Sequence, residues 1–245
     1  MEILLKLTNV EKSYGERKAV NKINFIVKEG EVLGFLGPNG AGKSTSINMI
    51  STIIDLDGGK IEFRNKDITS NINYFKKNLG VVPQDIAVFG NLTAYDNVKF
   101  FCSLYGLKGK ELNENVKEAL EYVGLWDRRK EFPTAFSGGM KRRLNIACSI
   151  AHKPKLLIMD EPTVGIDPQS RNNILNTVKK LNSEGTTIIY TSHYMEEVEA
   201  VCKRLIIMDE GKIIEEGTID NLKLKYCKEN LEEVFLELTG KELRD

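Results

Sequence analysis

The first third of the chain has the pattern of short β-strands, and at residues 23–27 apolar and polar residues alternate with a period of two, as in a half-buried strand. Such strands are predicted at residues 4–10, 23–27, 32–36, 61–63 and 79–82. The third of them is a short apolar run that leads into a glycine-rich loop. The residues that follow the loop, 43–54, are predicted to form a helix.

The middle of the chain has a helical pattern instead. Between Leu112 and Val123, apolar residues recur at the spacing of one helix face. Further helices are predicted at residues 93–105 and 137–151, because each of these segments begins with a Thr or Ser that can cap a helix N-terminus.

In the last third, strand and helix patterns alternate, as they do in α/β folds. The continuous apolar run at residues 156–159 is typical of a strand buried on both faces. Asp167 and Pro168 predict a helix N-terminus, with Asp as the cap and Pro at the first helical position. A strand is expected at residues 186–191 and a hairpin around residues 209–211, before two short closing helices.

The composition suits a globular domain. The chain has 245 residues, of which 41% are hydrophobic and 29% charged, and its 35 basic and 35 acidic residues cancel. This balance gives no sign of a nucleic-acid surface. We expect no signal peptide and no membrane-spanning helix, since no apolar run approaches the roughly 20 residues that a span requires.

Several residues are expected to be structural only. The four cysteines are far apart and are expected to be buried, reduced thiols: Cys102, Cys148, Cys202 and Cys227. His152, which precedes Lys153 and Pro154 at a helix end, is expected to be a surface or capping residue. The basic run at residues 141–143 is expected to be a solvated helix face.

Residues 37–44 match the phosphate-binding pattern G-x-x-x-x-G-K-[ST] between a predicted strand and a predicted helix. Glycines let backbone N–H groups face an anion, and the helix adds the positive end of its dipole. Lys43 is expected to contact the β- and γ-phosphates, and Ser44 to ligate Mg²⁺. The nucleotide-binding residues expected in this segment are Gly37, Pro38, Asn39, Gly40, Ala41, Gly42, Lys43, Ser44 and Thr45.

A pair of carboxylates, Asp160 and Glu161, follows the apolar run at residues 156–159. The carboxyl ends of strands are where α/β sheets bind ligands. Asp160 is predicted to hold Mg²⁺ through water, and Glu161 to polarise the water that attacks the γ-phosphate. Alone the pair is a weak signal, because acidic residues often end strands.

Two further segments complete an ordered set of motifs: residues 136–140 (Phe-Ser-Gly-Gly-Met) and residues 191–193 (Thr-Ser-His). The order resembles that of the ATPase subunits of ABC transporters over nearly the whole chain. The resemblance implies an α/β P-loop NTPase with a RecA-like parallel-sheet core, an N-terminal antiparallel β subdomain and a helical signature subdomain at about residues 86–152. The ATPase domain is expected at residues 1–220, followed by a short helical extension at residues 221–245.

The resemblance also implies roles for individual residues. Tyr14 looks like the aromatic residue that stacks on adenine, and Gln84 like the glutamine that contacts Mg²⁺ and the attacking water. His193 looks like the switch histidine that bonds to the γ-phosphate. The expected catalytic residues are Glu161, His193, Gln84 and Lys43. The expected ligands of Mg²⁺ are Ser44, Gln84 and Asp160.

The resemblance further implies that the site needs a second copy of the chain. Ser137, Gly138 and Gly139 resemble the signature that caps the γ-phosphate of an ATP bound to the opposite subunit, and Asp167 resembles a residue that crosses the interface. A helix N-terminus in a separate helical arm cannot reach the phosphate loop of its own chain, so a head-to-tail homodimer is expected. ATP then joins the two subunits, and its hydrolysis releases them.

The signature departs from the commonest family pattern, Leu-Ser-Gly-Gly-Gln, at Phe136 and Met140. This variant and residues 230–240 resemble the ABC-2 type subgroup, in which a separate ATPase pairs with a six-helix membrane protein that is usually an exporter. The expected partner is a multi-helix membrane permease, and the expected location is the cytoplasmic face of the cell membrane. Apolar residues within 86–95 are candidates for the permease groove, although core packing explains them equally well.

Two alternatives remain at this point. A soluble ABC-type ATPase of translation or DNA repair usually carries two cassettes or a long coiled-coil insertion, and this chain shows neither. A P-loop GTPase would need an N-K-x-D motif, and Asn65-Lys66-Asp67 is one residue too short.

Overall fold

The computed structural model describes residues 2–240. The chain divides into two compact units, one formed by residues 2–75 and 187–240 and the other by residues 76–186. Helix α2 (Ile72–Lys77) contains the point where the chain passes from the first unit to the second. Among the described residues, no helix combines the length and apolar character needed to cross a membrane.

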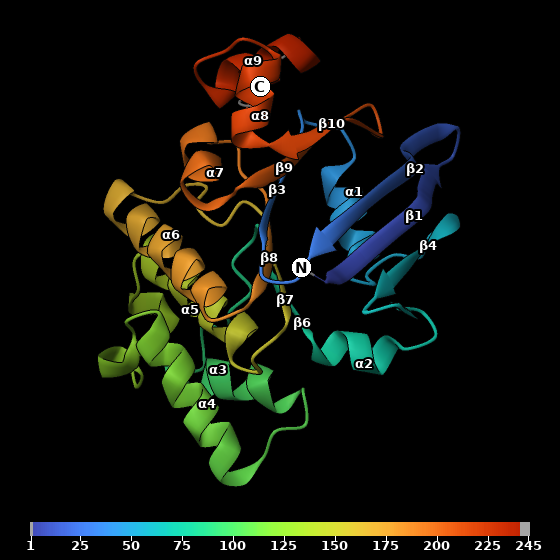
Figure 1. The fold of residues 1–245 in the computed structure, drawn as a ribbon. Coiled ribbons are helices and arrows are strands. Elements are labelled where there is room, and N and C mark those ends of the chain that lie inside the picture. The colour runs from blue at the N-terminus through green and yellow to red at the C-terminus, as the bar shows by residue number, and fades with distance from the viewer. Residues whose placement is uncertain (1, 241–245) are drawn as a thin grey trace. The chain divides into compact units, whose positions relative to one another are not determined.

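An antiparallel sheet forms the N-terminal part of the first unit. Its strands are β1 (Ile3–Tyr14), β2 (Arg17–Lys28), β4 (Gly58–Phe63) and β5 (Lys66–Asp67). They pair in the order β2-β1-β4-β5, and β1, β2 and β4 lie side by side in Figure 1. Ile23, Phe25 and Val27 are all buried, which confirms the pattern of period two. Strand β1 is longer than predicted, because its pairing with β2 continues to Tyr14 and Arg17 at the turn.

The first unit also contains four strands around the predicted phosphate loop. They are β3 (Val32–Leu36), β8 (Thr187–Tyr190), β9 (Arg204–Asp209) and β10 (Lys212–Thr218). Strand β3 pairs in parallel with β8 on one side and with β9 on the other, and β10 pairs antiparallel with β9. Every residue of β3 is buried, as the continuous apolar run predicts for a central strand.

Four more helices belong to the first unit: α1 (Lys43–Ile50), α7 (Met195–Val201), α8 (Ile219–Lys225) and α9 (Leu231–Thr239). Helix α1 ends earlier than predicted, because Thr52 adopts a left-handed backbone with a φ of 58°. Helices α8 and α9 confirm the two closing helices. Residues 241–245 of the predicted C-terminal extension lie outside the described residues, and its boundary at residue 220 stays a prediction, as does the helical subdomain at about 86–152.

The second unit combines a pair of parallel strands with helices. The strands are β6 (Leu79–Val82) and β7 (Leu156–Met159). The helices are α3 (Ala94–Ser103), α4 (Gly109–Tyr122), α5 (Gly138–Ile150) and α6 (Pro168–Ser183), with short 3₁₀ turns η1 (Trp126–Arg128) and η2 (Pro133–Ala135). The predicted caps are confirmed: the side chains of Thr93, Ser137 and Asp167 each accept a hydrogen bond from a backbone N–H in the first turn of their helix.

The prediction of a solvated basic helix face at residues 141–143 was wrong. Arg142 is only 3% exposed and Arg143 is half-buried. The physical reason is that both guanidinium groups donate to backbone carbonyls of neighbouring segments, which replaces the hydrogen bonds lost with water.

The predictions for His152 and Cys227 were also wrong. His152 is buried: its ring stacks on Tyr105 at 3.5 Å between centroids, and its Nε2 lies 2.9 Å from the carbonyl of Leu79. All four thiols are free, but Cys227 is exposed, because it lies just beyond the end of α8.

Candidate functional site

The phosphate loop of the first unit joins β3 to α1. Gly40 and Gly42 have φ angles of 78° and 105°, which glycine adopts at little cost and other residues rarely adopt. Gly42 is the N-cap of α1, so Lys43 and Ser44 occupy the first turn of the helix. The first-turn N–H groups of a helix have no partner within the helix, and they favour an anion such as a phosphate.

Two glycines of this loop are also required by packing. A Cβ on Gly37 would lie 2.2 Å from the carbonyl oxygen of Met208, and a Cβ on Gly42 would lie 2.3 Å from that of Ala19. Both contacts are with rigid backbone, so any larger residue would push the loop away from β9 and β2. The sequence motif explains these glycines by phosphate binding alone, and the structure adds a second reason.

Lys43 and Ser44 differ in their surroundings. Lys43 is 8% exposed, and its Nζ donates to the carbonyls of Gly37, at 2.5 Å, and Pro38, at 3.2 Å. Its ammonium group is therefore held over the loop that is expected to receive phosphates. Ser44 is exposed, which leaves its hydroxyl accessible, whereas Ser46 is buried and donates to the carbonyl of Gly42.

Tyr14 belongs to the β1–β2 hairpin, which contacts the phosphate loop of the first unit through Arg17. It ends β1 with 53% of its surface exposed, so an aromatic face is available for stacking. Arg17 pairs with Tyr14 across the turn and donates to the carbonyl of Gly40 at 3.2 Å, which ties the hairpin to the loop. Next to this contact lies a cavity of about 340 Å³ lined by Arg17, Lys18, Asn39, Gly40, Asp209, Glu210 and Gly211.

His193 follows β8 and is half-buried. The segment that carries it is fixed by Glu197, a carboxylate that is 2% exposed. Glu197 accepts hydrogen bonds from the hydroxyls of Tyr190 and Ser192, both at 2.9 Å. Sequence reasoning missed Glu197, since an acidic residue in a short helix normally indicates a solvated face.

In the second unit, Asp160 and Glu161 lie directly after β7, and the backbone N–H of Asp160 donates to Val82 at 2.9 Å. Glu161 is 8% exposed and has a φ of 46°. A left-handed backbone costs a residue with a side chain about 1–3 kcal/mol, and such strain is concentrated at functional sites. The Nε2 of Gln84 donates to Oε2 of Glu161 at 3.0 Å, so the structure joins these two predicted catalytic residues.

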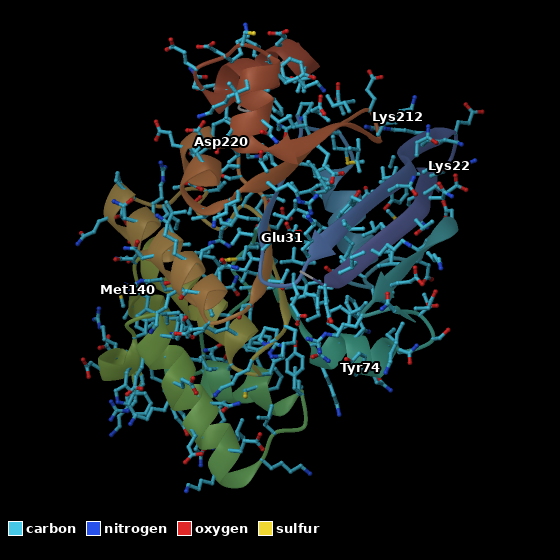
Figure 2. All side chains as sticks on the ribbon, in the orientation of Figure 1. Lys22, Glu31, Tyr74, Met140, Lys212 and Asp220 are labelled. Atoms are coloured by element: carbon cyan, nitrogen blue, oxygen red, sulfur yellow. The ribbon has the colours of Figure 1, made fainter. Side chains whose placement is uncertain are left out.

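The signature segment begins α5. Ser137 and Gly138 are exposed, and Met140, labelled in Figure 2, lies in the first turn with its N–H donating to the hydroxyl of Ser137 at 3.3 Å. Gly139 is buried, and a Cβ there would lie 2.2 Å from Oγ of Ser170 in α6. The second glycine of the signature is therefore required for close packing within the chain.

Asp167 is the N-cap of α6 and lies close to Gly139 and Ser170. Its carboxylate accepts a hydrogen bond from the backbone N–H of Ser170 at 2.9 Å, and that bond holds the pKa of Asp167 below its ordinary value. The capping role expected from the sequence is confirmed. Asp167 is exposed, which also fits the predicted role across an interface.

Comparison with known proteins identifies the family. The model of the ABC transporter family matches residues 20–164. The linearmycin resistance ATP-binding protein LnrL of Bacillus subtilis is 50% identical over 96% of this chain and 75% of its own length. The Nod factor export ATP-binding protein I of Sinorhizobium fredii is 38% identical over 88% of this chain and 63% of its own length.

A solved ATP-binding cassette agrees with the fold. It is a dimer in a post-hydrolysis state, bound to ADP and Pi, and it is 28% identical to this chain with a TM-score of 0.79 over 88% of this chain and 98% of its own. With the P-loop fold and the motif residues described above, these similarities show that the chain belongs to the ABC transporter family, as an ATP-binding and ATP-hydrolysing cassette subunit.

Proposed function

We propose that this chain supplies the energy of ATP hydrolysis to a separate multi-helix membrane permease that exports its substrate. Two relatives named for resistance and for export support the direction of transport. The cassette would then be held at the cytoplasmic face of the cell membrane by its permease. A role in translation or DNA repair is not favoured, because both of these relatives carry the names of transport or resistance proteins.

Each motif residue has a proposed part in binding. Tyr14 stacks on adenine, and the N–H groups of the phosphate loop and Lys43 bind the phosphates. Residues of the signature, Ser137 and Gly138, bind the γ-phosphate held by a second copy of the chain. The exposure of Tyr14, Ser137 and Gly138 supports these roles, since all three residues are accessible from solvent.

The proposed metal is Mg²⁺, which takes oxygen ligands and is usually held by one or two carboxylates together with substrate phosphates. The exposed hydroxyl of Ser44, the carboxylate of Asp160 and the amide oxygen of Gln84 fit this preference. When bound, Mg²⁺ neutralises charge that develops on the phosphates.

The chemistry is assigned to Glu161, supported by Gln84 and His193. Glu161 accepts the proton of the attacking water, and the amide of Gln84 holds the carboxylate in place. His193, which follows β8, donates a hydrogen bond to the γ-phosphate. The observation that carries the proposal is the contact of 3.0 Å between Gln84 and the nearly buried carboxylate of Glu161.

The test is Glu161→Gln, which keeps the shape of the side chain but removes its basicity. We expect ATP turnover to fall at least about 100-fold, as for the loss of a general base, and ATP to trap a stable dimer. Turnover is measured as phosphate release, and the dimer by size-exclusion chromatography with light scattering. Glu232→Gln, an exposed change in α9, is the matched control. A Glu161→Gln protein that stays monomeric with ATP and hydrolyses it normally would contradict both assignments.

A further inference from the structure

Arg142 is an unexpected component of the second unit. It lies on α5, two residues beyond the signature segment 136–140, and only 3% of it is exposed. Its guanidinium group donates to the carbonyl of Pro83 at 2.8 Å and to the carbonyl of Gln84 at 2.5 Å. One planar fork of N–H groups thus holds two consecutive carbonyls of the segment that carries Gln84.

Two other residues on the same face of α5 bind the same segment. Ser149 donates to the carbonyl of Val81 at 2.7 Å, and the side-chain oxygen of Asn145 accepts from the N–H of Ala87 at 3.3 Å. Spacings of three and seven residues place Arg142, Asn145 and Ser149 along one side of a helix. This loop-binding stripe fixes the backbone between residues 81 and 87.

The side chain of Gln84 therefore depends on a backbone that is fixed from α5. Beyond β6 the segment belongs to no helix or strand, and Gln84 is exposed. Its carbonyl is held by Arg142 while its Nε2 reaches Glu161. An exposed segment without regular structure opens easily when its hydrogen bonds are lost, so the position of the Gln84 amide depends on the guanidinium group.

The chemistry of Arg142 argues against a space-filling role. Within residues 2–240 no carboxylate lies at ion-pair distance from it, and burial lowers its pKa despite the more distant charge of Asp85. Its Nε is enclosed and has no hydrogen-bond partner in this part of the chain. Burying a charged group under these conditions is costly, and an apolar residue would fill the same space at lower cost.

We propose that Arg142 is a positioning residue for ATP hydrolysis: it holds the Gln84 segment so that the Gln84 amide stays bound to Glu161. The inference rests on the proposed function, in which Glu161 activates water. Since Arg142 and Ser137 are on the same helix, it also gives a physical link from the signature to the catalytic carboxylate.

Arg143 is a matched control. It is the next residue of α5, its guanidinium group also donates to a backbone carbonyl at 2.8 Å, and its Nε is likewise enclosed without a partner among the described residues. The carbonyl belongs to Val123 at the end of α4 and not to the Gln84 segment. Replacing either arginine thus removes a hydrogen bond from a buried guanidinium group to a backbone carbonyl, but only Arg142 donates to the Gln84 segment.

The experiment is a pair of double-mutant cycles on kcat for ATP hydrolysis. Arg142→Met should lower kcat about 10-fold or more, and Gln84→Ala should then lower it by less than about 3-fold further, because the amide is already misplaced. In the control cycle, the fold-reductions in kcat caused by Arg143→Met and by Gln84→Ala should multiply in the double variant. Arg142→Lys, which keeps the charge but lacks the planar fork of the guanidinium group, should give an intermediate kcat with the same non-additivity. Multiplicative effects in the Arg142 cycle would overturn the proposal.

A second measurement needs no ATP. Amide hydrogen exchange of residues 83–87 should accelerate about 10-fold or more in Arg142→Met and stay unchanged in Arg143→Met. If Arg142→Met does not fold, Arg142→Lys is used in both experiments. A wild-type chain without ATP hydrolysis would contradict the proposed function, whereas unchanged exchange in the Arg142 variant would contradict this inference alone.

Discussion

The two glycines of the signature have different surroundings. Gly139 is required by packing within the chain, whereas Gly138 has room around it and can serve ligand binding. A Cβ on Gly139 would lie 2.2 Å from Oγ and 2.4 Å from Cβ of Ser170. A Cβ on Gly138 would meet nothing closer than Cδ1 of Ile166, at 3.9 Å. The sequence motif treats the two positions alike, because a pattern of residue types contains no information on what lies opposite each one.

We therefore expect Gly139→Ala to lower the free energy of unfolding by about 1–3 kcal/mol, as other overpacked substitutions do. Gly138→Ala should stay within about 0.5 kcal/mol of the wild type. Urea unfolding measures both. The double variant Gly139→Ala/Ser170→Gly should recover part of the lost stability, because the clashing side chain is gone. No recovery, or an equal loss in Gly138→Ala, would refute the packing argument.

His152 gives the fold a dependence on pH. Burial lowers its pKa from the ordinary 6.5 to about 4, against the opposing effect of the Leu79 carbonyl. The unfolded chain binds a proton at His152 below pH 6.5, whereas the folded chain does so only near pH 4. The stability contributed by neutral His152 is therefore present above pH 6.5 and is lost as the pH falls toward 4.

Between pH 7 and pH 5, His152 should account for a loss on the order of 2 kcal/mol in the free energy of unfolding. Urea unfolding at both pH values, for the wild type and for His152→Gln, isolates this contribution. The variant is less stable at pH 7, but its own decrease toward pH 5 should be smaller by the same amount. Equal pH dependence of the two proteins would exclude His152 as the cause.

At the scale of secondary-structure elements, local signals predicted the helix starts well. Thr93, Ser137 and Asp167 cap their helices as expected, because a cap involves only residues within one turn. Element lengths were predicted less well. Strand β1 continues to the turn because β2 pairs with it, and that pairing is set by residues elsewhere in the chain.

The ion pair between Arg204 and Glu31 links segments of the first unit that are far apart in the sequence. Arg204 at the start of β9 donates to the carboxylate of Glu31 and to the carbonyl of Ile26, each at 2.6 Å, and the side chains of Arg204 and Glu31 are only 12% and 13% exposed. A nearly buried pair of this kind leaves a costly unpaired charge when one partner is removed.

Arg204→Met should lower the free energy of unfolding by about 2–4 kcal/mol. Lys110→Ala, which removes the highly exposed pair with Glu114, should change it by less than about 0.5 kcal/mol. Thermal and urea unfolding compare the two variants. Similar losses in both would mean that burial does not decide the strength of these pairs.

At the scale of the whole molecule, exposed apolar side chains in the second unit are candidates for contact with the permease. Ile86, Phe89 and Phe100 are 38%, 43% and 42% exposed. The ring of Phe89 contacts those of Phe100 and Phe101, with centroids 5.3 Å and 5.8 Å apart. Core packing, the other explanation of the apolar residues at 86–95, does not account for the exposure of Ile86 and Phe89.

Phe89→Ser should reduce the fraction of the chain that sediments with the membranes of cells that express it, and reduce transport, while ATP hydrolysis by the purified chain stays within about 2-fold. Ile53→Ser is the control, because it also replaces an exposed apolar side chain with serine, at a position in the first unit that is 67% exposed. A parallel loss of transport and hydrolysis in Phe89→Ser would contradict docking at this surface.

The sequence by itself predicted most of the strands and helices, although not β5, α2 or α7, and it predicted the helix caps and the motifs, because these depend on periodicity and on chemistry within a few positions. Only the tertiary structure showed that Gly37, Gly42 and Gly139 face backbone or side chains from distant segments, that Arg142 and His152 are buried, and that Gln84 reaches Glu161. These features depend on which segments become neighbours when the chain folds, and that information is distributed over residues far apart in the sequence.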